Sequence, residues 1–242
     1  MKKKISFLII IPARFKSSRL PGKPLLKIKK IPMIIRTCRQ CLKAVSHSKI
    51  VVATDDIRIK NICRDYGFNS IITKKNCLTG TDRVAEIAKK TNFSHYINIQ
   101  GDEPIFNPKD IRNLLININK HHEDVLLGYT KIKKINDFIN PNIPKIIFDN
   151  KKYLVYSSRA SIPYSQLKKK IKAYKGVWAY AYPRNKLMIF SNNKEKTPLE
   201  RIEDIEILRF IDLGIKVKMI KMSGMSKSVD IKSDIKKIES FL

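Results

Sequence analysis

The amino-acid sequence predicts an α/β fold: a mostly parallel, Rossmann-like sheet with a β-rich insertion in its second half. Short β-branched runs alternate with longer amphipathic stretches over residues 5–99, which is the pattern of repeated βαβ units. The run at residues 7–11 is apolar on both faces, as expected for a central parallel strand. After about residue 120 this alternation gives way to several strand-like runs, which predict the insertion.

Residues 1–120 are predicted to form a nucleotide-binding lobe of alternating strands and helices. A first strand is expected over residues 5–11, where isoleucine, leucine and phenylalanine predominate. The predicted helices are longer amphipathic stretches, and the predicted strands are short apolar runs rich in β-branched residues. The expected order is helix 33–45, strand 50–53, helix 57–66, strand 70–73, helix 82–90 and strand 96–99.

Residues 121–195 are predicted to form the β-rich insertion, which would cover a substrate site or make a dimer interface. Strands are expected there over 125–132, 145–148, 153–156 and 176–182, with little helix between them. Residues 196–242 are predicted to contain a helix over 199–213, a strand over 217–221 and a helix over 231–241. Gly214 directly follows the first of these helices, where a left-handed residue commonly ends a helix. All three segments are expected to belong to one domain.

The net charge of +29 allows two interpretations. An excess of 50 basic over 21 acidic residues suits a protein that binds nucleic acid or an anionic membrane. The lysines, however, are spread along the chain among many isoleucines and asparagines, a bias that an AT-rich genome also produces. No RRM, KH, helix-turn-helix or zinc-finger pattern organises them. We therefore expect an anionic small substrate and no specific nucleic acid, and keep a basic nucleic-acid-binding protein as the remote alternative.

The cysteines and the first apolar run predict a cytoplasmic protein without membrane insertion. Cys38, Cys41, Cys63 and Cys77 form no pattern typical of secreted proteins, so a reducing compartment is expected. Cys38 and Cys41 have a CxxC spacing, but no second pair completes a zinc site, and both are interpreted as small apolar residues of a helix. The run at 5–11 is too short to span a bilayer and has no cleavage site after it.

The loop at residues 12–24, directly after the first predicted strand, is a candidate phosphate-binding loop. It brings together Arg14, Lys16, Arg19 and Lys23 with two serines and a glycine. A triphosphate needs several cations and close backbone donors, and this loop offers both. It matches neither the Walker A pattern nor the dinucleotide-binding GxGxxG pattern.

Two aspartates are candidate Mg²⁺ ligands. Asp102 follows the predicted strand 96–99 next to Gly101, where a carboxylate is well placed to hold Mg²⁺ on a phosphate, although an Asx turn is an alternative role. Asp230 precedes the last predicted helix, so it competes with a role as the N-cap of that helix.

Six motifs, in this order, carry a resemblance to a known family. They are IIIPARFKSSRLPGKPL from residue 9, VATDD from 52, TGTDR from 79, NIQGDEP from 98, YSSRASIPY from 156 and LERIEDIEILR from 199. Over nearly its whole length the sequence resembles the 3-deoxy-manno-octulosonate (Kdo) cytidylyltransferase, or CMP-Kdo synthetase, family. The resemblance implies a fold of the nucleotide-diphospho-sugar transferase type. It also implies Mg²⁺-dependent transfer of CMP from CTP to the anomeric hydroxyl of Kdo, with release of pyrophosphate, for lipopolysaccharide synthesis.

The resemblance also implies roles for residues on the nucleotide side. The residues implied to bind CTP are Ala13, Arg14, Ser17, Lys23, Arg83 and Gln100. Arg14 and Lys23 would hold the phosphates and, together with Asp102, form the catalytic set, with Arg19 supporting the loop. Asp102 and Asp230 would hold Mg²⁺. Metal coordination would also lower the pKa of the attacking hydroxyl, so no dedicated histidine base is expected.

On the sugar side the resemblance is weaker. The residues implied to contact the acidic sugar are Arg159, Tyr174, Trp178 and Glu206. The family's His-Leu-Gly-Ile-Tyr-Gly-Tyr reads Tyr-Lys-Gly-Val-Trp-Ala-Tyr over 174–180, the segment 163–176 is shorter, and Ile207 stands where the family has glutamine. Lineage drift explains these changes, and so does a modified ulosonate such as 8-amino-Kdo or a sialate-like sugar. A homodimer through the β-rich segment is also implied.

Overall fold

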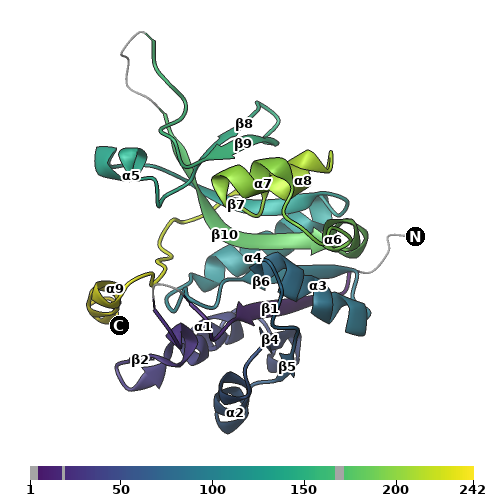
Figure 1. Ribbon diagram of the computed structural model, residues 1–242, viewed down its shortest axis with the longest axis vertical. Coiled ribbons are helices and arrows are strands. Elements are labelled where there is room, and N and C mark those ends of the chain that lie inside the picture. Colours follow the sequence, from purple (N-terminus) through teal and green to yellow (C-terminus); the bar gives the residue numbers. More distant parts are fainter. Residues whose placement is uncertain (1–4, 18–19, 167–171) are drawn as a thin grey trace.

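A nine-stranded mixed sheet runs through the computed structural model, which describes residues 5–17, 20–166 and 172–242 (Figure 1). Seven strands follow one another in the order β11-β7-β10-β6-β1-β4-β5, and β8 and β9 lie off this path. The predicted α/β fold with a mostly parallel sheet is therefore confirmed. Arg19, which was expected to support the first loop, lies outside the described residues.

The first half forms the parallel part of the sheet, as predicted. Its strands are β1 (Phe7–Ala13), β4 (Ile50–Thr54), β5 (Ser70–Ile72) and β6 (His95–Ile99). Its main helices are α1 (Met33–Leu42), α2 (Ile57–Asp65) and α3 (Gly80–Lys90). β1 pairs in parallel with β4 on one side and β6 on the other, which explains why its sequence is apolar on both faces.

Several elements of the first half were not predicted. They are the short turns η1 (Lys23–Leu25) and η2 (His47–Lys49), the hairpin strands β2 (Lys27–Ile28) and β3 (Ile31–Pro32), and the helix α4 (Pro108–Lys120). The helix α4 had recognisable signals. The Asn107 side chain accepts a hydrogen bond from the Lys109 N–H, and Pro108 occupies the first helical position. Its buried residues Ile111, Leu114 and Ile118 are spaced three and four apart.

The second half extends the same sheet with β7 (Val125–Lys131), β10 (Tyr174–Pro183) and β11 (Val217–Lys221). β10 is antiparallel to both neighbours, β6 and β7, whereas β11 is parallel to β7. β8 (Lys145–Phe148) and β9 (Leu154–Ser158) form a hairpin beside the start of β10. The predicted strands are thus present, but helices α5 (Ile135–Ile139) and α6 (Arg184–Ser191) were not predicted.

The continuous helix predicted over 199–213 is wrong. The chain forms α7 (Pro198–Glu203) and α8 (Leu208–Asp212) instead, and Asp204 between them has a left-handed backbone with φ +52°. The break turns Glu206 towards the first turn of α3, where its carboxylate accepts a hydrogen bond from the Thr81 N–H at 3.1 Å. Gly214 has φ +67° after α8, as expected. The last helix is α9 (Lys232–Glu239).

One apolar core lies on each face of the sheet. The core beneath α1, α2 and α4 contains Ile34, Ile59 and Ile111, and the other core packs α3, α6 and α8 against β10. Cys38 and Cys41 are buried free thiols on α1, which confirms their interpretation as small apolar residues. Burial raises the pKa of Cys41 to about 12. Within the described ranges, no helix is both long enough and apolar enough to cross a membrane.

Candidate functional site

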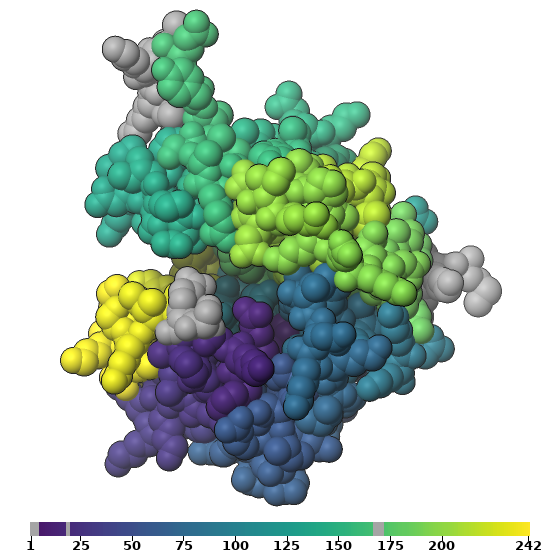
Figure 2. All heavy atoms as spheres, viewed as in Figure 1, coloured from purple at the N-terminus to yellow at the C-terminus, as the bar shows by residue number. Residues whose placement is uncertain are grey.

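A cleft opens at the carboxyl ends of β1 and β6, where open parallel sheets bind ligands. Figure 2 shows the hollow between the purple and blue N-terminal half and the green helices of the second half. Its largest part, cavity 1, has a volume of about 440 Å³. The sequence-predicted residues that line cavity 1 are Ala13, Arg14, Ser17, Lys23, Arg83, Gln100, Asp102, Glu206 and Asp230.

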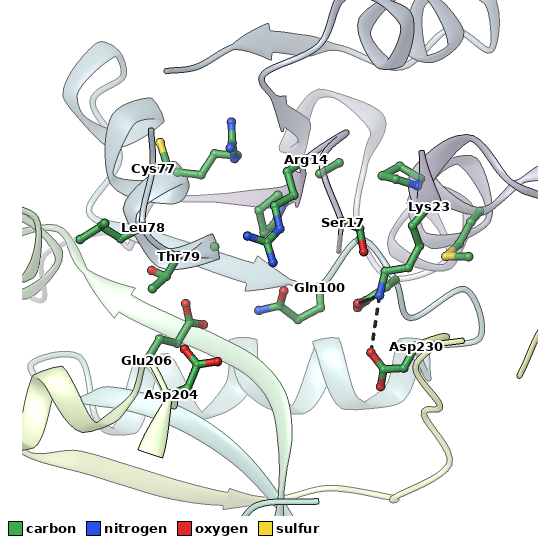
Figure 3. A pocket seen from close by; sticks show the side chains of 18 of the residues that line it. Arg14, Ser17, Lys23, Cys77, Leu78, Thr79, Gln100, Asp204, Glu206 and Asp230 are labelled. Carbon is green, nitrogen blue, oxygen red and sulfur yellow. Dashed lines mark hydrogen bonds and ion pairs between the residues drawn. The ribbon is translucent and has the colours of Figure 1, made fainter. Parts of the chain in front are cut away.

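The loop after β1 is held in a tight turn. Gly22 has φ +68°, a conformation that glycine adopts without strain, and its N–H donates to the Phe15 carbonyl at 3.1 Å. The Phe15 N–H donates to the Asp55 carboxylate at 3.1 Å, and the Arg58 guanidinium lies over the Phe15 ring. Because both ends of the loop are held in this way, Arg14 and Lys23 are directed into the cavity from two sides (Figure 3).

Lys23 links the two predicted metal ligands. Its ammonium Nζ lies 2.6 Å from the Asp102 carboxylate. It also lies 3.6 Å from the Asp230 carboxylate, as Figure 3 shows. It also donates to the Val229 carbonyl at 2.7 Å, and the Val229 N–H donates to the Asp102 carbonyl at 3.0 Å. These bonds bring the C-terminal segment against the loop after β6, although the two are far apart in sequence.

The two carboxylates fit a Mg²⁺ that also binds phosphate. In the described part of the chain, no group of three or more histidine, cysteine or acidic side chains is arranged to hold a metal ion. Mg²⁺ is usually bound in nucleotide sites by one or two carboxylates, with phosphate oxygens and water completing its shell. Asp230 is not the N-cap of α9, because that position is Ile231, and the Asp234 carboxylate accepts from the N–H groups of Asp230 and Ile231.

Glu103 lies next to Asp102 and is almost completely buried. Burial, followed by the nearby carboxylates of Asp102, Asp110 and Asp230, raises its pKa to about 8. One of its oxygens has no hydrogen-bond partner among the described residues. Glu103 is therefore protonated at neutral pH when no cation is bound beside it.

Arg83 lies at the end of cavity 1 near α3 and is rigidly held. Its guanidinium pairs with Asp55 at 3.1 Å and donates to the Thr73 hydroxyl and to the Lys74 carbonyl. Gln100 reaches the same end from β6, opposite Gly80 at the first turn of α3. These polar groups, together with backbone N–H groups at the start of a helix, suit a base and sugar–phosphate better than an apolar ligand.

The opposite wall of cavity 1 comes from α7 and the turn that follows it, and buried ion pairs hold this wall. The fully buried Arg209 pairs with Glu200 at 2.6 Å and with Asp82 of α3 at 2.8 Å. Glu206 bonds to the backbone of Thr81, and burial raises the pKa of its carboxyl group. The wall is thereby fixed to the first turn of α3.

Lys196 and Asp204 form an ion pair on this wall, and both line cavity 1. The hydrogen bond from Lys196 lowers the pKa of Asp204, and the charges of Arg159 and Arg14 add to this effect. Asp204 thus lies among cations from both halves of the molecule. Figure 3 shows Asp204 and Glu206 on the side of the cleft opposite Arg14.

A second hollow, cavity 3, adjoins cavity 1 and has a volume of about 340 Å³. The two share Gln100, Asp102 and Glu206 among their lining residues. Arg159 and Trp178, both predicted to contact substrate, line cavity 3. The Arg159 N–H donates to the Glu203 carboxylate at 2.9 Å, and its Nε donates to the Glu203 carbonyl at 2.7 Å.

Two residues of the predicted sugar side lie elsewhere. The Tyr174 ring packs against Phe148 and Tyr129, with ring centroids 4.8 and 5.6 Å apart, and it is not among the residues that line cavities 1 and 3. Ile207 is completely buried in the core at the start of α8. Of the changed positions Tyr174, Trp178 and Ile207, only Trp178 faces this pocket, so these three changes do not meet at one place.

Sequence reasoning missed four charged residues around the two cavities: Lys145, Lys196, Asp204 and Arg209. Arg209 and Lys145 lie in stretches that were assigned to a helix and a strand, where a charged residue normally faces solvent. Lys196 and Asp204 lie in the region that was predicted to include a continuous helix, and the break at Asp204 brings them together. No local sequence pattern predicts which charged residues will be buried or paired in this way.

Comparisons with known proteins agree with this geometry. The model of a family described as cytidylyltransferase matches residues 8–228. A 3-deoxy-manno-octulosonate cytidylyltransferase of Fusobacterium nucleatum is 36% identical over 241 residues, covering 98% of this chain and 97% of its own. The Escherichia coli protein of that name is 32% identical over 234 residues, covering 97% and 95% of the two chains.

A solved structure is also closely similar. It is that of CMP:2-keto-3-deoxy-manno-octonic acid synthetase complexed with CTP. It superposes with a TM-score of 0.91 at 32% identity and covers 98% of both chains. The likeness extends over all the elements that build the cleft.

Proposed function

Because the chain belongs to the cytidylyltransferase family and, within it, to the 3-deoxy-manno-octulosonate cytidylyltransferases, we propose that it transfers CMP from CTP to the anomeric hydroxyl of Kdo. Pyrophosphate is the second product, and CMP-Kdo serves lipopolysaccharide synthesis. The observation that carries the proposal is the pair of adjoining cavities, which share Gln100, Asp102 and Glu206. One cavity offers the cations that a triphosphate needs, and the other offers Arg159 for an acid.

The nucleotide binds in cavity 1 in this proposal. Arg14 and Lys23 neutralise the phosphate charge, while Ala13, Ser17, Arg83 and Gln100 surround the cytidine. The sugar hydroxyl attacks the α-phosphorus as the bond to pyrophosphate breaks, so the chain mainly has to position the two substrates and stabilise charge. Asp102 and Asp230 would hold Mg²⁺, which when bound neutralises phosphate charge and lowers the pKa of the attacking hydroxyl.

The acceptor binds in cavity 3, next to the shared residues. Arg159 pairs with its carboxylate, Glu206 accepts from its hydroxyl groups, and Trp178 packs against the ring. Because Tyr174 and Ile207 lie away from this cavity, two of the three sequence changes give no reason to expect a modified sugar. Kdo is therefore favoured over 8-amino-Kdo or a sialate-like acceptor.

The experiment that tests the proposal is pyrophosphate release from CTP and Mg²⁺ with Kdo, 8-amino-Kdo and a sialate in parallel. We expect release with Kdo and a lower kcat/KM with the other two. Release with only one of the others would assign a different acceptor. Stabilisation by CTP without release from any acceptor would contradict the proposed reaction. Salt-sensitive binding to nucleic acid of any sequence, without pyrophosphate release, would instead favour a nucleic-acid-binding protein.

A homodimer in the cytoplasm completes the proposal. The β-rich half exposes several large apolar side chains: Ile135, Ile139, Val155 and Tyr164. Exposed apolar side chains of this kind suit contact with a second copy of the chain. Buried free thiols at Cys38, Cys41 and Cys63 suit a reducing compartment. Light scattering during size-exclusion chromatography measures the mass in solution, and a monomer at micromolar concentration would contradict the dimer.

A further inference from the structure

Lys145, the first residue of β8, is a lysine with 0% of its surface exposed. Its ammonium donates to the Arg159 carbonyl at 2.6 Å and to the Asn140 carbonyl at 3.0 Å. Among the described residues, no carboxylate oxygen lies within ion-pair distance of it. A buried charge without an ion-pair partner is costly, so its presence calls for a reason.

The two carbonyls that Lys145 binds belong to two segments that line cavity 3. Arg159 directly follows β9, and residues 140–144 form the loop before β8, from which Asn142 and Pro144 face the cavity. The Arg159 guanidinium returns to the same loop by donating to the Pro141 carbonyl at 3.2 Å. Lys145 therefore joins the loop to the backbone of the residue that we assign to the acceptor carboxylate.

The charge of Lys145 is only partly balanced. Burial lowers the pKa of its ammonium, and the Glu203 carboxylate raises it. Glu203 is itself occupied, because it accepts from the Ser158 hydroxyl at 2.5 Å and from the Arg159 N–H at 2.9 Å. The Arg159 guanidinium also lies 3.9 Å from the Asp204 carboxylate, so Lys145 and Arg159 face the carboxylates of Glu203 and Asp204. The ammonium of Lys145 adds its positive charge to that of Arg159 beside cavity 3.

We propose that Lys145 is a positioning and specificity-determining residue for the acid group of the acceptor. It holds Arg159 and the 140–144 loop in register around cavity 3, and its buried positive charge favours a carboxylate there over a neutral group. This inference rests on the proposed function, because it assumes that cavity 3 receives an acidic sugar.

The test compares Kdo with its carboxamide, which has the same shape without the charge. Lys145→Met keeps the length of the side chain and removes the charge. We expect the KM for Kdo to rise about tenfold, with the KM for CTP unchanged. The preference for Kdo over the carboxamide, measured as a ratio of kcat/KM, should shrink by the same factor. A purely structural role predicts equal losses for both acceptors, and that result would overturn the inference.

Two further variants make the test specific. Lys151→Met removes an exposed charge from the tip of the same β8–β9 hairpin and should leave both acceptors unaffected. In an Arg159→Met background, Lys145→Met should add little, because Lys145 acts through Arg159. Independent, additive losses would contradict the positioning role.

The outcome remains decisive if Lys145→Met does not fold. Lys145→Gln keeps a hydrogen-bond donor without the charge, and the same loss of preference for the carboxylate is expected. An unchanged preference in a folded Lys145→Gln protein would reject the charge effect. Failure of the proposed function is distinguishable, because the wild-type protein itself would then release no pyrophosphate with Kdo.

Discussion

The two walls of the cleft are built in different ways. The first wall consists of loops that follow β1 and β6, and its main side chains, Arg14, Lys23 and Asp102, lie in short contiguous motifs. The second wall is assembled from α7, the turn before α8, the residue after β9 and part of β10, and its shape depends on buried charges such as Arg209. The first wall is thus encoded locally and the second by contacts between distant segments. Substitutions in the first should affect chemistry, and those in the second should affect stability and the acceptor.

The largest effect is expected from Arg209→Met, which breaks the second wall. The change leaves the buried carboxylates of Glu200 and Asp82 without their cation, at a cost of about 3–5 kcal/mol. Thermal unfolding should show a fall in Tm of about 10 °C. Arg201→Met on the neighbouring helix α7 is the matched control, because Arg201 is exposed and pairs only at the surface. Equal Tm changes in the two variants would show that the buried pairs do not hold this wall.

Lys23→Met tests the first wall. The change removes the ammonium that links Asp102 and Asp230, which is also the cation that we propose binds the triphosphate. We expect kcat/KM to fall about 10²–10³-fold with little change in Tm, because both carboxylates remain partly hydrated. Lys27→Met removes an exposed charge from the neighbouring β2 and should have no such effect. A large fall in Tm without loss of activity would show that Lys23 stabilises the fold and does not take part in the reaction.

Ile207→Gln tests whether residue 207, in the second wall, affects stability or the choice of acceptor. The change restores the family's residue, yet it places an amide in a fully buried apolar site, so we expect a loss of about 2 kcal/mol of stability. The ratio of kcat/KM for Kdo to that for 8-amino-Kdo should stay the same. Ile202→Gln, at an exposed position on α7, is the stability control. A changed acceptor preference at unchanged Tm would place residue 207 in substrate contact after all.

The same contrast explains what could be predicted from the sequence. The alternating strands and helices of the first half, and the loop that carries Arg14 and Lys23, are local patterns that can be recognised without coordinates. The break at Asp204 could not be found in this way, because residues 199–213 have helical periodicity. The break after α7 is instead associated with two long-range contacts. Glu206 accepts a hydrogen bond from the Thr81 N–H, and Arg209 pairs with Asp82. Lys145 was missed for a similar reason, because its burial depends on its bonds to the carbonyls of Asn140 and Arg159 in the folded chain.

The smallest effect concerns the pH dependence of stability. It tests whether Glu103, next to Asp102 in the first wall, is ionised in the folded chain. The pKa of Glu103 is raised from its ordinary value of 4.5 to about 8, mainly by burial. Below about pH 4.5 the carboxyl group is protonated in both the folded and the unfolded chain. Between about pH 4.5 and 8 only the folded chain keeps the proton, so stability falls as the pH rises, and above about pH 8 the decline ends.

Glu103→Gln isolates this contribution, because the amide is neutral at every pH. In metal-free buffer, urea denaturation between pH 6 and pH 7 should show that the wild-type protein loses about 1 kcal/mol more than the variant. Other groups whose protonation changes in this window do so in both proteins and cancel in the difference. Added Mg²⁺ should reduce the difference, since a cation held by Asp102 and Asp230 favours the ionised form of their neighbour. Parallel pH curves for the two proteins would mean that Glu103 is ionised in the folded chain. The first wall would then carry an additional negative charge at Glu103, although this side chain is buried.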